Sequence, residues 1–401
     1  MERSPSLTLR VSERINCRSP RVAIWTSAFE ADMEAISSEV ALLRRSFPRS
    51  VSWGLSHRHW ALLSPTRGFC LHPKLQLLFR AATRLLEPLF EINHIFGSVG
   101  DWFYLAGQRR RPTVLTAAAM NSPVERSLLD RVDCFVAEYP GGRDDLRRLG
   151  IGDDRLRLVL PPVDLQRFHP TPRPAEPFTA LFASSPEKPS WLAARGLPAI
   201  LDAAALRPQM RFRLLWRPWG DSLPIIRGQI EQRQLHNVDL AVGRVTDMSA
   251  EYARAHVTVA PFTDLNRCKP MPNSLVESLA SSRPVICSPL VGLAPLVSEH
   301  RAGVVCEPLG AALVEALDRA ETDWDALSIH ARRLAEQYFA QETFVRKYQQ
   351  IYGELIGERG TTCGWPLENL IPSPPINSVA SMNRRLIGFV LSVGCSPHFV
   401  A

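Results

Sequence analysis

The chain alternates short apolar runs with stretches of helical spacing, and this alternation constrains its fold more than any other feature. Residues 22–26 (VAIWT) form an apolar run, and Met33, Ile36, Val40 and Leu43 follow it at helical spacing. Such alternation is typical of parallel strands joined by crossover helices. Parallel sheets are covered by helices on both faces, so the pattern predicts doubly wound α/β structure.

The alternation occurs in two series, separated by the Pro-rich segment 171–177 (TPRPAEP), which is typical of a domain linker. We predict a first domain over residues 20–170, a second over 178–356 and a tail over 357–401, where Gly, Thr, Ser and Pro prevail. Two doubly wound domains place a ligand-binding cleft between the carboxyl ends of their strands. The expected strands cover residues 22–26, 51–55, 92–96, 113–116, 134–137, 156–160, 179–183, 212–216, 238–241, 257–260, 285–287 and 303–306.

Composition narrows the classes of protein. A net charge of +7 over 401 residues is below what a dedicated nucleic-acid binder carries, so no nucleic-acid partner is expected. The eight cysteines form no C-x-x-C pair, and the chain has neither a long apolar span nor a secretory leader. We therefore expect a soluble cytoplasmic protein with reduced thiols.

The segment 269–286 (KPMPNSLVESLASSRPVI) is the most informative for chemistry. Asn273 or Ser274 is a natural helix cap, and the helix start from Asn273 to Leu275 would offer backbone N–H groups to an anion. Glu277, one turn along, could accept hydrogen bonds from a ribose diol while a diphosphate rests on the helix start. An ordinary capped helix with a solvent-facing glutamate fits the same spacing.

Several segments resemble the retaining glycosyltransferases of family 4, also called glycosyltransferase group 1. They are Asn237–Met248, Tyr252–Phe262, Pro272–Ala280 with Arg283–Ile286, and Arg155–Pro170, which is similar to the family's interdomain segment. The resemblance covers residues 20–356 and implies the GT-B architecture, α/β with two Rossmann-like doubly wound domains facing a cleft. It also implies transfer of a sugar from a nucleoside diphosphate donor, and no further cofactor is expected. No metal ion is predicted, because basic residues and the helix dipole take the place of a divalent cation and no Asp-x-Asp pair stands at a matching strand end.

In that family a glutamate, seven residues and a second glutamate mark the donor site. Glu277 matches the second position, which contacts the ribose, but Lys269 stands at the first, where the transferred sugar is held. The family also places basic residues after the first strand of its second domain, where they neutralise the leaving diphosphate. Arg195, before Gly196, matches that position, with Lys188 as a competing candidate and Arg217 as a second charge. We therefore predict Arg195, Lys269 and Glu277 as catalytic residues, with Arg195, Lys269 and Arg217 as charge partners of the diphosphate.

The first domain matches the family less well. Residues 29–34 (FEADME) replace its usual glycine pair, and the loop 97–101 is the expected acceptor side, near His94. Residues 75–89 predict an amphipathic helix with basic flanks, which fits either an anionic membrane surface or the chain's own sheet. Residues 1–170 carry 24 basic and 18 acidic side chains, so this is the half that would face an anionic partner.

The sequence as a whole predicts a retaining glycosyltransferase that takes a nucleotide sugar and acts on a glycan, a lipid-linked sugar or another acceptor. Peripheral contact with the inner membrane face through the first domain would suit a lipid-linked acceptor. Two alternatives stay open. One is a sugar-nucleotide epimerase of the same architecture, and the other is a non-catalytic GT-B protein, which Lys269 in place of the glutamate would fit.

Overall fold

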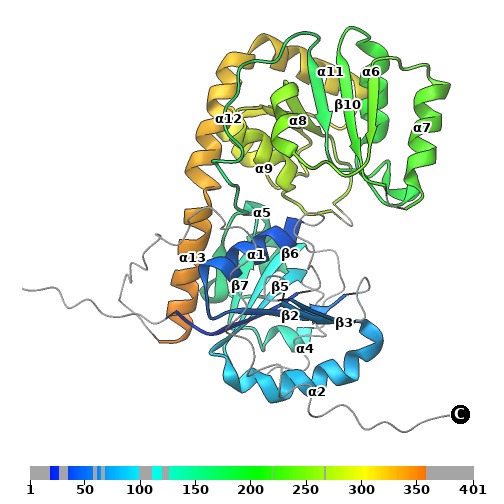
Figure 1. Cartoon of the computed structure of the whole chain (residues 1–401). Coiled ribbons are helices and arrows are strands. Elements are labelled where there is room, and N and C mark those ends of the chain that lie inside the picture. Colours follow the sequence, from blue (N-terminus) through cyan, green and yellow to red (C-terminus); the bar gives the residue numbers. More distant parts are fainter. Residues whose placement is uncertain are drawn as a thin grey trace, which may run out of the picture.

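The computed structural model describes residues 19–26, 35–56, 61–64, 68–98, 111–119, 126–218, 220–265 and 268–357. They form two α/β domains, one above the other in Figure 1, each built on its own sheet. The predicted fold class is confirmed. No helix in these ranges is long and apolar enough to cross a membrane.

The first domain contains an eight-stranded sheet in the order β3-β4-β2-β1-β5-β6-β7-β8. Every neighbouring pair is parallel except β3 and β4, which run antiparallel. The strands are β1 (Val22–Trp25), β2 (Val51–Leu55), β3 (Ala61–Ser64), β4 (Gly68–Leu71), β5 (Ile92–Ser98), β6 (Thr113–Ala119), β7 (Cys134–Ala137) and β8 (Leu156–Leu158). The helices are α1 (Ala35–Ser46), α2 (Gln76–Leu86), α4 (Arg126–Leu129) and α5 (Pro140–Arg148).

The second domain contains a fully parallel six-stranded sheet in the order β11-β10-β9-β12-β13-β14. The chain order reverses between β9 and β12, and doubly wound sheets bind ligands outside the carboxyl ends of the strands at such a switch point. The strands are β9 (Thr179–Phe182), β10 (Arg211–Trp216), β11 (Val238–Val242), β12 (Val257–Ala260), β13 (Val285–Cys287) and β14 (Gly303–Val305). The helices are α6 (Leu197–Leu206), α7 (Ser222–Gln232), α8 (Met248–Arg254), α9 (Asn273–Ala280), α10 (Ala294–Glu299), α11 (Gly310–Thr322) and α12 (Trp324–Tyr338).

The last described helix, α13 (Gln341–Leu355), returns to the first domain (Figure 1). Its buried residues Phe344, Tyr348 and Tyr352 belong to the same core cluster as β1 and α1. His94 on β5 hydrogen-bonds through Nδ1 to the Tyr352 hydroxyl at 2.6 Å and through Nε2 to Thr116 at 2.7 Å. The sequence assigns α13 to the second domain, residues 178–356, but its apolar face completes the core of the first.

The chain passes between the two domains twice, and these two interdomain crossings lie side by side. The Val163 backbone N–H donates to the Phe339 carbonyl at 2.7 Å, and Val163 forms an isolated β-bridge with Ala340. Further along the first crossing, the predicted linker is tied to the second domain by Arg283. This buried guanidinium donates to the carbonyl oxygens of Thr171 at 3.1 Å and of Pro172 at 2.9 Å.

Candidate functional site

Arg195 lies in the loop between β9 and α6, at the carboxyl edge of the second sheet. Its Nη1 donates to Ser184 Oγ at 3.2 Å, and its guanidinium lies 5.4 Å from the centre of the Phe262 ring. Gly196 fixes this arrangement with a φ of 73°, and a Cβ on it would approach the Pro261 carbonyl oxygen to 1.9 Å. Only glycine combines that conformation with so close an approach, so Gly196 holds Arg195 against the loop that follows β12.

Glu277 lies on α9, and its Oε2 accepts a hydrogen bond of 2.9 Å from the hydroxyl of Tyr252 on α8. Burial raises the pKa of Glu277 to about 7, against the opposing effects of the Tyr252 hydrogen bond and of the Arg167 and Arg217 charges. Arg217 follows β10, where its backbone N–H donates to Ser185 Oγ at 3.2 Å. A carboxyl group that already accepts a hydrogen bond from one hydroxyl can also accept hydrogen bonds from the hydroxyls of a bound diol.

The start of α9 differs from the prediction. Pro272 occupies the cap position, and Asn273 and Ser274 are the first residues of the helix. Asn273 Oδ1 accepts from Lys269 Nζ at 3.3 Å, and the Leu275 N–H donates to the Pro272 carbonyl at 3.1 Å. Leu275 is also buried, so an anion at this helix start would meet the N–H groups of Asn273 and Ser274 rather than that of Leu275.

Lys269 lies between two carboxylates of the first domain. Its Nζ is 2.9 Å from Glu138 Oε2 and also hydrogen-bonds to Glu39. The Lys269 side chain is 11% exposed, and those of Glu39 and Glu138 are 0% and 1% exposed. Burial by itself lowers the pKa of Lys269, but the two carboxylates outweigh it and raise that pKa; burial and the Glu39 charge raise the pKa of Glu138 well above its usual range. Lys269 thus joins the two domains instead of facing solvent.

Lys188 is the one predicted basic residue that the structure leaves on the outer surface. Its side chain is exposed, with Nζ 5.4 Å from the centre of the Trp191 ring. The predicted acceptor side falls largely outside the described residues, since these omit 27–34 and 99–110. His94, predicted to lie near it, is fully buried, and burial lowers its pKa to about 3.

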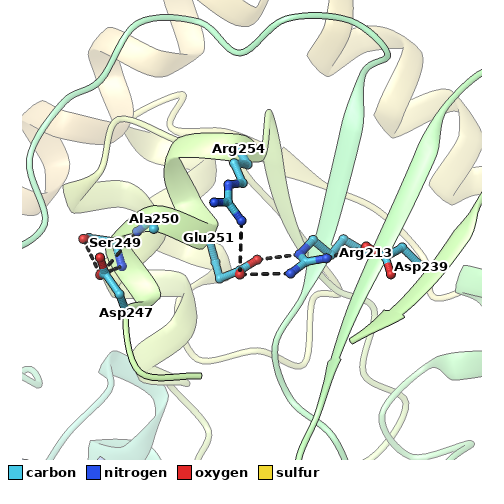
Figure 2. A network of polar contacts seen from close by, with 7 residues as sticks. All are labelled: Arg213, Asp239, Asp247, Ser249, Ala250, Glu251 and Arg254. Atoms are coloured by element: carbon cyan, nitrogen blue, oxygen red, sulfur yellow. Dashed lines mark hydrogen bonds and ion pairs between the residues drawn. The ribbon is translucent and has the colours of Figure 1, made fainter. Parts of the chain in front are cut away.

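A cavity of about 320 Å³ opens at the carboxyl end of β11, and the sequence alone did not indicate it. Its lining includes Gly243, Val245, Asp247, Glu251 and Arg254. Figure 2 shows how one wall is fixed: Glu251 accepts from Arg213 Nη2 at 2.9 Å and faces Arg254, while Asp247 caps α8 by accepting from the Ser249 N–H at 3.0 Å. The same helix carries Tyr252, so α8 connects the cavity to Glu277.

One family model matches part of the second domain. Residues 191–323 match the family model described as glycosyl transferases group 1. That match contains Arg195, Arg217, Lys269 and Glu277. The match covers 133 of the 401 residues, and these begin and end within the second domain. A search of curated proteins found no match.

Solved structures resemble most of the described chain. Sucrose-phosphate synthase from Thermosynechococcus elongatus has a TM-score of 0.69 at 17% identity, with 85% of this chain and 100% of that one covered. HepE of Anabaena, in complex with UDP and glucose, has a TM-score of 0.68 at 15% identity over 84% and 100%. A glycosyltransferase from Rickettsia africae has 0.67 at 14% over 85% and 99%. At these identities the likeness establishes the GT-B fold.

Three residues of the site were missed from sequence. Tyr252 opens the segment Tyr252–Phe262, which resembles the family, but its position in the sequence does not indicate a contact with Glu277. Glu39 and Glu138 lie 230 and 131 residues from Lys269, and neither belongs to a motif. The one available signal was Lys269 itself, because a buried lysine requires carboxylate partners.

Proposed function

We propose that this chain is a retaining glycosyltransferase that moves a sugar from a nucleoside diphosphate donor to a glycan, a lipid-linked sugar or another acceptor. The observation that carries the proposal is the gathering of Arg195, Arg217 and Glu277 at one edge of the second sheet, all within the family-matched segment. The retaining outcome rests on the family resemblance. The proposal includes no metal ion.

Each group has a role in the proposed reaction. Breaking the bond between the sugar and the diphosphate places negative charge on the departing phosphate, and preorganised cations and N–H groups lower that barrier. Arg195 and Arg217 would supply the charge, and the first residues of α9, Asn273 and Ser274, the backbone donors. Glu277 would accept the ribose hydroxyls.

We propose that the nucleobase of the donor binds in the cavity at the end of β11. It lies at the carboxyl end of the same sheet, and α8 lines it with Glu251 while presenting the next residue, Tyr252, to Glu277. One helix would thereby set the spacing between base and ribose. A volume of about 320 Å³ is in the range of pockets that hold small ligands.

Lys269 modifies the family scheme in this proposal. Because both first-domain carboxylates engage it, we assign it to interdomain contact rather than to the diphosphate. The sugar of the donor would then bind beside a cluster of three charged side chains, Lys269 of the second domain and Glu39 and Glu138 of the first.

Ligand-linked thermal stabilisation tests the proposal. The full chain is heated with UDP, GDP and ADP, and with the corresponding nucleotide sugars, because a bound ligand raises the unfolding temperature with the logarithm of its concentration over Kd. Glu277→Gln should lose most of that rise, whereas Lys188→Ala should keep it. No stabilisation by any nucleotide would refute a donor site here.

Turnover assays separate the remaining alternatives. Arg195→Ala should lower turnover of the donor far more than it weakens nucleotide binding, since the charge it offsets grows in the transition state. An epimerase would isomerise a nucleotide sugar with no acceptor present. A non-catalytic protein would bind the donor and leave it unchanged with every acceptor offered.

A further inference from the structure

Arg195 is also anchored by the thiol of Cys268, in the loop between β12 and α9. Its Nη1 hydrogen-bonds to Cys268 Sγ as well as to Ser184. Cys268 is 6% exposed, and its S–H donates to the Lys269 carbonyl oxygen at 3.3 Å. Burial raises the pKa of this thiol to about 11, against the opposing effect of the Arg195 charge, so the thiol keeps the proton that it donates. The sulfur is therefore left as an acceptor for the guanidinium.

The backbones of the Arg195 loop and the Cys268 loop are tied together. The Thr263 backbone N–H donates to the Ala194 carbonyl oxygen at 3.0 Å, and the Thr263 hydroxyl donates to the Ala193 carbonyl oxygen at 3.0 Å. The two loops therefore form one unit at the carboxyl edge of the second sheet, with Arg195 on one loop and the thiol that it contacts on the other.

Lys269 directly follows Cys268 and is held by the first domain. Glu39 of α1 and Glu138, at the end of β7, both contact its Nζ. The three side chains are at most 11% exposed. Adjoining groups thus connect the first domain to Arg195: the two carboxylates contact Lys269, whose carbonyl accepts from the thiol, and the thiol contacts the guanidinium.

A second contact between the domains reaches the same segment. The Gly292 N–H donates to the Pro270 carbonyl oxygen at 2.8 Å. A Cβ on Gly292 would lie 2.8 Å from the Cβ of Tyr139, which follows Glu138 in the first domain, so Tyr139 packs closely on this glycine. The first domain therefore acts on residues 268–270 both through Lys269 and, by way of Gly292, through Pro270.

We propose that Cys268 is a positioning residue, which orients Arg195 when the two domains are in contact. A cation lowers the barrier most when it is oriented before the reaction, because no reorganisation is then needed as charge develops. While the two carboxylates hold Lys269, the neighbouring sulfur is fixed as an acceptor for Arg195. When the domains separate, Lys269 loses these partners, and the thiol loses its fixed position. The role of Arg195 rests on the proposed function, whereas the coupling of Cys268 to the first domain does not.

Thiol alkylation without nucleotide tests the coupling by itself. The full chain is treated with N-ethylmaleimide, and mass spectrometry of its peptides gives the alkylation rate of each cysteine. Glu39→Gln with Glu138→Gln changes only the first domain, so an effect on Cys268 must cross the interdomain contact. We expect Cys268 to react about tenfold faster in this variant, within the usual range for coupling between two sites. Cys287, which is 0% exposed in the same domain as Cys268, should keep the parental rate.

A matched double variant controls for the loss of charge. Asp144→Asn with Asp153→Asn removes two carboxylates from the same domain, but their side chains are 63% and 67% exposed, so Cys268 should react at the parental rate. Unchanged circular dichroism shows that both double variants fold. An unchanged Cys268 rate in Glu39→Gln with Glu138→Gln would overturn the coupling. Equal acceleration at Cys268 and Cys287 would also overturn it, because the whole second domain would then be loosened.

Turnover tests the effect on Arg195, measured as release of UDP or GDP from the nucleotide sugars of the thermal experiment. Cys268→Ala should lower kcat about tenfold, as expected for the loss of one hydrogen bond to a charged group, and leave KM and nucleotide Kd near the parental values. Cys268→Ser should restore most of the loss, because a hydroxyl donates and accepts as the thiol does. Cys306→Ala, at a half-buried cysteine of the same domain, is the matched control and should keep the parental kcat.

A double-mutant cycle separates positioning from a merely structural role. Once Arg195 is replaced by alanine, Cys268→Ala should lower kcat no further, because the two residues act as one. If Cys268→Ala lowers kcat by the same factor with and without Arg195, or not at all, the positioning role is wrong and the proposed function stands. If the parent chain releases no nucleoside diphosphate from any nucleotide sugar, the proposed function fails together with the role of Arg195, and the alkylation rates alone decide whether Cys268 is coupled to the first domain.

Discussion

Lys269→Met would remove the cation that contacts two buried carboxylates, Glu39 and Glu138. Glu39 and Glu138 are 0% and 1% exposed, so neither can be solvated in its place. Removing one partner of a buried ion pair typically costs about 3–5 kcal/mol, because the remaining charge is left uncompensated. Glu138, whose pKa is already well above its usual range, would then hold its proton more strongly, so we expect the cost near the lower end of that range.

The pH dependence has a defined sign. A carboxyl group whose folded pKa exceeds its unfolded value binds more protons when folded, so its folding free energy becomes less favourable as pH rises. Lys269→Met should therefore lose more stability in mildly alkaline buffer than in mildly acidic buffer. Adding Glu138→Gln should recover part of the loss, and Lys269→Glu, which places three carboxyl groups together, should be worse than Lys269→Met.

Urea unfolding monitored by circular dichroism measures these differences. Arg147→Met is the matched control, because Arg147 pairs with Asp144 and Asp153 on the surface, where each of the three side chains is at least 41% exposed. Exposed pairs contribute about 0–1 kcal/mol. If Lys269→Met costs no more than this control, the buried cluster is not closed in solution and its assignment as an interdomain contact is wrong.

Three further outcomes follow from single features. With a pKa of about 7 for Glu277, UDP should bind about tenfold more tightly at about pH 8 than at about pH 6. Titration calorimetry measures both affinities, and the Glu277→Gln variant should lose this pH dependence. Gly196→Ala combines a φ of 73° with a clash against Pro261, so it should lower the free energy of unfolding in urea by about 2 kcal/mol or more. Gly150 has a φ of 88° but open space around it, so Gly150→Ala should lower that free energy by about 1 kcal/mol. Equal losses in the two variants would contradict the steric argument. Because burial lowers the pKa of His94 to about 3, the free energy of unfolding should fall by about 2 kcal/mol as pH drops from about 6.5 to 5. If the His94→Gln variant loses as much stability over the same pH range, His94 is not the cause.

Strands could be predicted from the sequence where they are short apolar runs that the structure buries completely. Cys134–Ala137 and Val285–Cys287 were predicted with the bounds that the structure has, and every side chain in both is buried. The short strands β3 and β4, at the edge of the first sheet, were not predicted. Gly68, which opens β4 with a φ of 94°, gives no strand signal of its own.

The site was predictable only where it is local. Arg195 and Glu277 stand in recognisable segments, and the structure brings both to the switch-point edge of the second sheet. The partners of Lys269 come from distant segments, which only the meeting of two domains brings together. Likewise, the apolar spacing of residues 75–89 indicated an amphipathic helix, but leucines occur all round it, so periodicity could not tell which face the sheet would cover.

The paired crossings at Val163 and Ala340 make the upper domain an insertion within the lower one. A mutant or chimera that exchanges this domain must be joined at two points at once, since cutting the chain after residue 340 would strip α13 from the core that it completes. Two neighbouring tethers also restrict how the halves can move: bending about the line that joins them is permitted, whereas twisting one half against the other would break the β-bridge.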